Sequence, residues 1–173
     1  MGLLNKLFGN SVRESSAVSA PTGTVASPLA GRLIPLEKIP DATFAEGILG
    51  PGCGIEPSGE TVCAPFDGEV TQIAATCHAV GLTSSDGIEL LIHVGMDTVK
   101  MNGRGFSMKV KEGQKIKAGQ PLLVFDRAEI KKAGYPATTA VIVTNGDEYS
   151  SVKVLAEGEI SVGKPILYAS RQN

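Results

Sequence analysis

The chain has 173 residues, 42% of them hydrophobic, so it can bury one substantial core. A net charge of −2 and only 5% aromatic residues argue against a nucleic-acid partner. No apolar stretch approaches the roughly 20 residues that cross a bilayer. The three cysteines form no CxxC motif and indicate reduced thiols, so we expect a cytoplasmic protein.

Residues 1–23 are expected to form a flexible leader, because residues 11–26 are rich in Ser, Ala and Thr. A short amphipathic helix at its start would gather four apolar side chains, Leu3, Leu4, Leu7 and Phe8. Such a helix could make peripheral contact with a membrane surface, although one this short is marginal alone. The folded domain is expected over residues 24–173.

Short β-rich runs separated by Gly and Pro follow from Ser27 onward, and the chain holds 21 glycines and 10 prolines. Two pairs of segments resemble each other: 27–36 with 64–73, and 112–123 with 157–167. Two such pairs in the same order predict an internal duplication. The expected fold is all-β, an antiparallel sandwich or barrel.

Helix is scarce in this pattern. Residues 126–129 form a capping box, and Gly134 and Pro136 end the helical turn that it starts. A second short turn is expected at residues 44–47. One or two helical turns therefore accompany the strands.

The only two histidines, His78 and His93, lie at the inner ends of one predicted β-hairpin. A two-residue loop at Ser85-Asp86 would place them opposite each other, and a loop at Asp86-Gly87 would make them diagonal neighbours. Both registers leave the rings on one face and within reach. A three-residue loop would change that parity.

Alternation along the second strand sorts its side chains into two faces. The core face is expected to hold Ile88, Leu90, Ile92 and Val94. The outer face is expected to hold Glu89, Leu91, His93 and Gly95, joined by His78 and Val80. An imidazole pair on such a face suits proton transfer, metal binding or phosphoryl capture, or simply a satisfied structural pair. Cys77 adjoins His78, but adjacent strand residues face opposite ways, which disfavours a Cys/His dyad.

The run at residues 87–99, GIELLIHVGMDTV, resembles the active-site segment of the glucose-family enzyme IIA of the bacterial phosphoenolpyruvate:sugar phosphotransferase system. Similar stretches occur at 40–47, 64–68, 76–78 and 112–114, so the resemblance spans about Thr24 to the C-terminus. It implies a cytosolic β-sandwich of the duplicated hybrid type. Such proteins carry a phosphoryl group from phospho-HPr to the IIB domain of a sugar permease, and some also regulate target proteins according to their phosphorylation.

By this resemblance, His93 is the nucleophile that becomes phosphohistidine on Nε2. His78 would help to hold the transferred group, and Thr76 would orient His78 through a hydrogen bond. The backbone carbonyl of Gly95 is our candidate acceptor for the other ring nitrogen of His93, because a pinned nitrogen sets the tautomer. No metal or other cofactor is required, since positioning supplies most of the catalysis.

A partner must bring its own histidine to His93, so a docking face should surround the site. Its apolar candidates are Phe44, Val80, Leu91 and Val99, and its acidic candidates are Asp41 and Asp97. Ile48 and Leu49 lie behind them and could equally be core. Asp97 could instead only cap the turn at Thr98.

Three other functions compete with the relay. A zinc peptidase of related architecture would use the pair at His78 and His93, but catalytic zinc usually takes three protein ligands. The pair could still hold zinc as a secondary property. A biotinyl or lipoyl carrier is disfavoured because Lys109 lies too close to Glu112. A purely regulatory binding module is the third alternative, since a phosphate adds roughly two negative charges to a docking face.

Overall fold

The structure, a computed structural model, describes residues 21–171. The predicted leader lies mostly outside these residues, so its helix and its membrane contact stay predictions. The strands in chain order are β1 (Thr24–Ala26), β2 (Gly31–Pro35), β3 (Gly52–Pro57), β4 (Thr61–Cys63), β5 (Gly68–Ile73), β6 (Ala79–Ser84), β7 (Glu89–His93), β8 (Phe106–Met108), β9 (Lys115–Ile116), β10 (Pro121–Phe125), β11 (Thr139–Val143), β12 (Ser151–Val154), β13 (Gly158–Ile160) and β14 (Pro165–Ser170). The helical turns are η1 (Leu36–Lys38), α2 (Ala42–Ala45), η2 (Thr98–Met101), α3 (Arg127–Lys132) and η3 (Gly146–Glu148).

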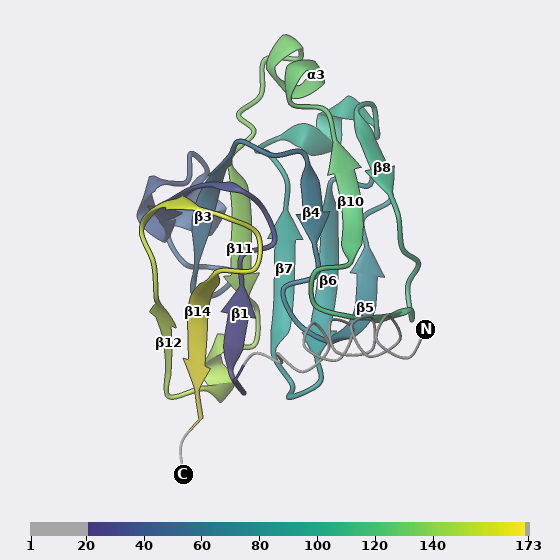
Figure 1. Cartoon of the computed structure of the whole chain (residues 1–173). Coiled ribbons are helices and arrows are strands. Elements are labelled where there is room, and N and C mark those ends of the chain that lie inside the picture. Colours follow the sequence, from purple (N-terminus) through teal and green to yellow (C-terminus); the bar gives the residue numbers. More distant parts are fainter. Residues whose placement is uncertain (1–20, 172–173) are drawn as a thin grey trace, which may run out of the picture.

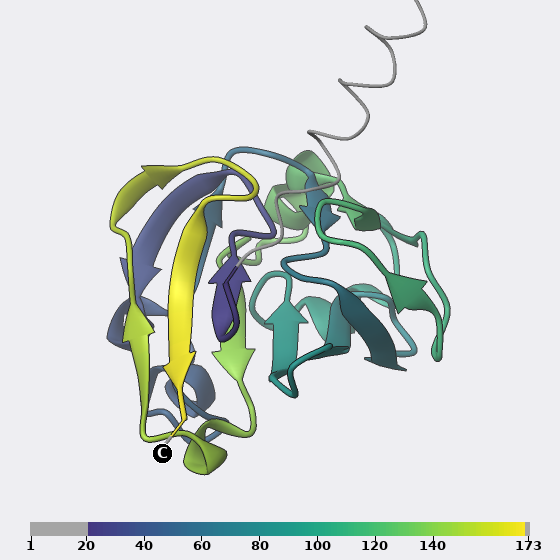
Figure 2. The same cartoon turned by 60° about the horizontal axis from the view of Figure 1, so that its bottom comes forward.

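One long sheet and two small sheets build the domain (Figure 1). The long sheet has the order β13-β2-β3-β11-β7-β6-β5-β9, and the small sheets have the orders β1-β14-β12 and β4-β10-β8. Figures 1 and 2 show the small sheets beside each other on one side of the long sheet. The main core lies between these layers, where Val25, Val62 and Ile92 are fully buried. The predicted all-β sandwich is confirmed.

The strand pairings repeat. β2 pairs with β13 and β1 pairs with β14, just as β5 pairs with β9 and β4 pairs with β10. These strands contain the two pairs of similar segments, so the predicted duplication is confirmed. We call residues 61–125 the histidine half, and residues 24–57 with 139–170 the covered half.

Both predicted helical turns form, although α2 begins two residues earlier than predicted, and η1, η2 and η3 add further turns to the one or two expected. The Asp126 carboxylate accepts a hydrogen bond from Glu129 N at 3.2 Å to start α3, and Ile130 is fully buried beneath that helix. The Asp41 carboxylate caps α2 through Thr43 N at 2.9 Å. Within residues 21–171, none of the helices is long and apolar enough to cross a membrane.

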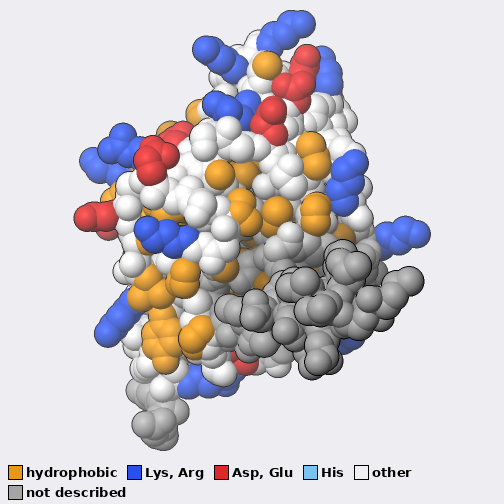
Figure 3. All heavy atoms as spheres, in the orientation of Figure 1, with side chains coloured by type: hydrophobic (Ala, Val, Ile, Leu, Met, Phe, Trp, Pro, Cys, Tyr) orange, Lys and Arg blue, Asp and Glu red, His pale blue; other side chains and the backbone are white. Residues whose placement is uncertain are grey.

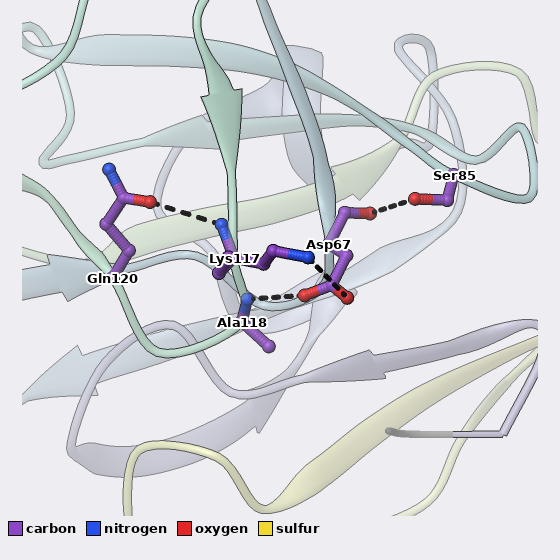
Figure 4. A network of polar contacts seen from close by, with 5 residues as sticks. All are labelled: Asp67, Ser85, Lys117, Ala118 and Gln120. Atoms are coloured by element: carbon purple, nitrogen blue, oxygen red, sulfur yellow. Dashed lines mark hydrogen bonds and ion pairs between the residues drawn. The ribbon is translucent and has the colours of Figure 1, made fainter. Parts of the chain in front are cut away.

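Asp67 ties together three turns at the end of the histidine half away from the histidines (Figure 4). Its carboxylate accepts from Ala118 N at 2.9 Å and lies 4.0 Å from Lys117 Nζ. Its backbone carbonyl accepts from Ser85 N at 2.9 Å and from Ser85 Oγ at 3.1 Å. An exposed ion pair contributes little, so the bonds to the backbone are what hold the turns.

Figure 3 shows hydrophobic side chains gathered over β12 and β14, on the face formed by the small sheets. Val154, Leu155 and Tyr168 are among the exposed apolar residues of that region. No histidine is visible in this view. The histidine pair belongs to β7 and to the approach to β6, both of which lie in the long sheet.

Candidate functional site

The hairpin that carries the histidines has a three-residue loop, so both predicted registers are wrong. Ala79 pairs with His93, Gly81 with Leu91, and Ser84 N donates to Ile88 O at 2.8 Å. Asp86 explains the longer loop, because its carboxylate accepts from Gly23 N at 2.6 Å and from Ser84 Oγ. Gly87 closes the loop at a φ of +98°, a conformation that favours glycine.

The two rings nevertheless converge, for a different reason from the one predicted. In a regular strand with this register, His78 would point away from His93. Cys77 has a φ of +60° just before β6 and breaks the alternation there. The imidazole centroids lie 4.7 Å apart at an interplanar angle of 81°. A local backbone irregularity therefore builds the pair.

Val80 is not part of the site, and its predicted place on the docking face is wrong. It pairs with Ile92 and is 1% exposed within the main core. The prediction failed because the three-residue loop shifts Val80 to the inner face. The inward alternation predicted for Ile92 and its neighbours along β7 is confirmed, since they are buried in the core.

Each imidazole is held through Nδ1. The Nδ1 atom of His93 lies 2.8 Å from Gly95 O, a pure acceptor, so His93 carries its proton on Nδ1. The Nδ1 atom of His78 lies 2.7 Å from Thr76 Oγ1. No buried side-chain nitrogen or oxygen among residues 21–171 lacks a hydrogen-bond partner, so neither Nε2 atom is sealed from solvent. Nε2 of His93 is therefore unprotonated and keeps its lone pair.

Both rings are held neutral near pH 7. Burial, and then the neighbouring His93, lower the pKa of His78 to about 4. Burial also lowers the pKa of His93, against the opposing effects of the Gly95 hydrogen bond and of the Asp41 and Asp97 carboxylates. A neutral imidazole keeps the lone pair that attack on a phosphoryl group requires.

Phe44 from α2 forms a wall of the site beside His93. Its ring centroid lies 5.0 Å from that of His93 at 56°, and the side chain is only 6% exposed. It belongs to a second apolar cluster on the outer side of the long sheet, which also contains Met96, Ala140 and Ile142. Phe44, predicted for the docking face, therefore has little exposed surface to offer a partner, because α2 tucks the ring against this cluster.

Other apolar residues predicted for the docking face, or behind it, keep exposed surface. Val99 is 50% exposed, and Leu91 is half-buried. Ile48 is 68% exposed and Leu49 is 38% exposed, so neither is core. These apolar side chains are at least partly exposed in the described part of the chain.

Asp41 and Asp97 are the acidic groups near His93, as their effect on its pKa requires. Asp97 makes no capping hydrogen bond to η2 with its side chain, so the capping alternative is wrong. Asp41 caps α2 through one carboxylate oxygen, Oδ1. Their negative charge suits a basic partner surface.

The donor set for a metal is small. His78 and His93 together supply two free Nε2 atoms, and no group of three or more His, Cys, Asp or Glu that could hold a metal occurs among residues 21–171. The pair alone does not fit a catalytic zinc centre. All three cysteines are free thiols.

Sequence reasoning missed two residues that surround the Gly95 peptide, Thr98 and Pro136. Thr98 is fully buried and donates from Oγ1 to Val94 O at 2.6 Å. Pro136 O accepts from Met96 N at 3.0 Å. Thr98 follows Gly95 in the chain and could have been suspected, but no pattern in the sequence points to Pro136.

Known proteins resemble this chain over most of its length. The family model described as phosphoenolpyruvate-dependent sugar phosphotransferase system, EIIA 1, matches residues 23–149. The solved structure of glucose permease IIA from Mycoplasma capricolum superimposes with a TM-score of 0.75 at 31% identity, and the match covers 83% of this chain and 93% of that one.

Curated relatives carry the same kind of domain within longer proteins. The beta-glucoside-specific EIIBCA component of Dickeya chrysanthemi is 40% identical over 88% of this chain, and that of Bacillus subtilis (strain 168) is 44% identical over 83%. The glucose-specific EIIBCA component of Corynebacterium glutamicum is 44% identical over 74%. The matched part is 24%, 24% and 19% of these relatives, so the chain spans about a quarter of their length or less. This chain belongs to the EIIA 1 family of the phosphoenolpyruvate-dependent sugar phosphotransferase system.

Proposed function

We propose that this chain is a phosphocarrier that accepts a phosphoryl group from phospho-HPr on His93 Nε2 and passes it to the IIB domain of a sugar permease. The observation that carries the proposal is the hydrogen bond from His93 Nδ1 to Gly95 O, which leaves Nε2 unprotonated beside a second imidazole. Membership of the EIIA 1 family supports it.

The transfer step exchanges one phosphorus–nitrogen bond for another. The Nε2 lone pair of His93 attacks phosphorus while the bond to the donor histidine breaks, and the donor ring keeps that electron pair. The proton stays on Nδ1 of His93, which donates to Gly95 O throughout. No acid or base has to act on the nucleophile, because the tautomer is already correct.

His78 stabilises the transferred group. When Thr76 Oγ1 donates to His78 Nδ1, the ring carries its proton on Nε2. That Nε2–H can donate to a phosphoryl oxygen, where a loose transition state places negative charge. Positioning and this donor account for the chemistry, so the proposed reaction uses no metal or other cofactor.

The partners follow from chemistry and from the relatives. The relatives are named EIIBCA components, and we infer a IIB domain as the acceptor for this chain. Their names include beta-glucoside and glucose at comparable identity, so the domain sequence does not rank the sugars. Such a relay would work in the cytoplasm, where HPr donates.

Incubation with phosphoenolpyruvate, enzyme I and HPr tests the proposal. Wild-type protein should acquire one acid-labile phosphate that maps to His93, and His93→Gln should acquire none. His78→Gln should still accept phosphate but should pass it to a IIB domain poorly. Normal labelling of His93→Gln would falsify the assignment, and a His78→Gln protein that accepts nothing would show that the two roles are reversed.

A regulatory binding module is the second candidate, favoured by the exposed apolar side chains at Ile48 and Val99. Phosphate on His93 would add about two negative charges to the site and change which partner binds. Zinc titration before and after phosphorylation separates a further role for the pair: phosphate should compete with any zinc held by His78 and His93. A catalytic peptidase would instead show hydrolysis that depends on zinc.

A further inference from the structure

The peptide that joins Gly95 to Met96 is hydrogen-bonded on both edges. Its carbonyl accepts from His93 Nδ1 at 2.8 Å, and its N–H donates to Pro136 O at 3.0 Å. Hydrogen bonds in a chain polarise one another, so an acceptor on the N–H side strengthens the carbonyl as an acceptor on the other side. The peptide therefore links the Pro136 carbonyl to the nucleophilic ring.

This peptide has little freedom to turn. Gly95 has a φ of +77°, and a Cβ placed there would lie 2.4 Å from Thr98 Cγ2 and 3.0 Å from Pro136 O. The backbone on the N-terminal side is also held, because Val94 N donates to His78 O at 2.8 Å and Val94 O accepts from Thr98. The carbonyl of Gly95 is thus held toward His93.

The position of Pro136 is set outside the histidine pair. It lies between α3 and β11, and Tyr135 N donates to Ile130 O of α3 at 3.2 Å. Thr138 is buried and donates from Oγ1 to a carboxylate oxygen of Glu56, in β3, at 2.5 Å. Two elements of the fold outside the histidine hairpin, α3 and β3, therefore anchor the segment on either side of Pro136.

We propose that Pro136 is a positioning residue for His93, whose carbonyl acts through the Gly95–Met96 peptide to favour the tautomer with a free Nε2. This inference rests on the proposed function, since His93 is the nucleophile of the proposed reaction. It assigns to the segment between α3 and β11 a part in phosphoryl acceptance. A proline serves there because only its carbonyl is needed, and its ring restricts the backbone.

Replacing Ala137 with lactic acid tests this role. The ester that results makes Pro136 O a weaker acceptor and leaves the Gly95–Met96 peptide unchanged. Ala156 replaced with lactic acid is the matched control, since it lies after β12, away from the site. Pro136→Ala is the second control, because it keeps the carbonyl and should keep the tautomer. Circular dichroism checks that each variant folds.

Imidazole nitrogen NMR on the unphosphorylated protein is the primary readout, and it does not depend on the relay. The Ala137 ester should lower the fraction of His93 protonated on Nδ1 and lower the pKa of His93. The kcat for acceptance from phospho-HPr should fall roughly two- to tenfold, which is the size expected for one weakened hydrogen bond, with KM unchanged. If Pro136 had a purely structural role, the Ala137 ester would lower stability. The tautomer of His93 and the pKa of His93 would then be the same as in the Ala156 control.

Two results would overturn the inference. One is a His93 spectrum in the Ala137 ester that matches the Ala156 ester. The other is a tautomer shift in Pro136→Ala as large as that in the Ala137 ester, which would implicate the ring. Failure of the wild-type protein to accept phosphate would instead contradict the proposed function. The NMR comparison of the His93 tautomer could still be interpreted.

Discussion

The two halves of the domain share one pattern of strand pairing but differ at equivalent positions of the sheet. Val94 N donates to His78 O at 2.8 Å, and Val143 N donates to Pro51 O at the same distance. By these bonds and by the strand registers, His78 corresponds to Pro51 and His93 corresponds to Ile142. One half presents two imidazoles where the other presents proline and a fully buried isoleucine.

The connections between strands explain the difference. Residues 36–51 join β2 to β3 and include α2, whose Phe44 packs in one cluster with Ile142. Only residues 74–78 join β5 to β6, so within residues 21–171 this connection gives the histidine half no comparable cover. The same α2 also reaches across to His93. The connection from β2 to β3 thus buries the site at Ile142 and forms one wall of the equivalent site at His93.

Removing the cover should have the largest effect on stability. Phe44→Ala deletes a buried ring and should cost about 3–5 kcal/mol of unfolding free energy, because the cavity lies between α2 and the long sheet. Urea unfolding measures the loss, with Val99→Ala at an exposed position as the control, expected to change stability by less than about 0.5 kcal/mol. Similar costs for the two variants would mean that α2 does not act as a cover.

The second largest loss of stability is expected from a side chain added in the turn after His93. Gly95→Ala places a Cβ against Thr98 at a left-handed φ and should cost about 2–4 kcal/mol while it displaces the carbonyl that pins His93. Gly113→Ala is the matched control, since it has a φ of +84° with nothing within 4 Å, and should cost only about 1 kcal/mol. Equal costs in thermal unfolding would contradict the crowding argument.

Acid should destabilise the protein through the histidine half. The pKa of His78 is lowered to about 4 when folded, against 6.5 when unfolded, so the unfolded chain binds more protons between these values. This contribution to stability is therefore fully present above pH 6.5 and is lost as the pH falls toward 4. His93, whose pKa is also lowered, acts in the same direction.

Unfolding free energy measured from pH 7 to pH 4 checks this slope. His78→Gln removes the titrating ring and should flatten the curve over that range. An unchanged slope in His78→Gln would show that other groups carry the acid sensitivity.

The smallest expected effect concerns the short connection itself. Cys77 adopts a φ of +60°, which favours Asn or Gly, so Cys77→Asn should stabilise the protein by about 0.5–1 kcal/mol. Cys63→Asn, in strand β4 where φ is not positive, should give no such gain. Urea midpoints compare the two, and a loss of stability in Cys77→Asn would mean that the thiol makes contacts that outweigh the backbone strain.

Sequence patterns with short range predicted much of this molecule correctly. The alternation along β7, the capping box at Asp126 and the two repeated segment pairs were all readable, because each depends on residues a few positions apart or on direct similarity. The Gly95 acceptor was equally local, lying two residues from His93. The pairing of the two histidines was also expected, although the expected register was wrong.

What the sequence by itself determined is therefore the all-β duplication, the inward face of β7 and the two histidines of one hairpin. Only the tertiary structure decided the loop length, which depends on Asp86 bonding to Gly23 at a separation of 63 residues, and with it the inward turn of Val80. It also decided that Phe44 walls His93 and that Pro136 reaches the Gly95–Met96 peptide. These contacts join segments far apart in the chain, and local periodicity carries no information about which distant backbone group a turn will meet.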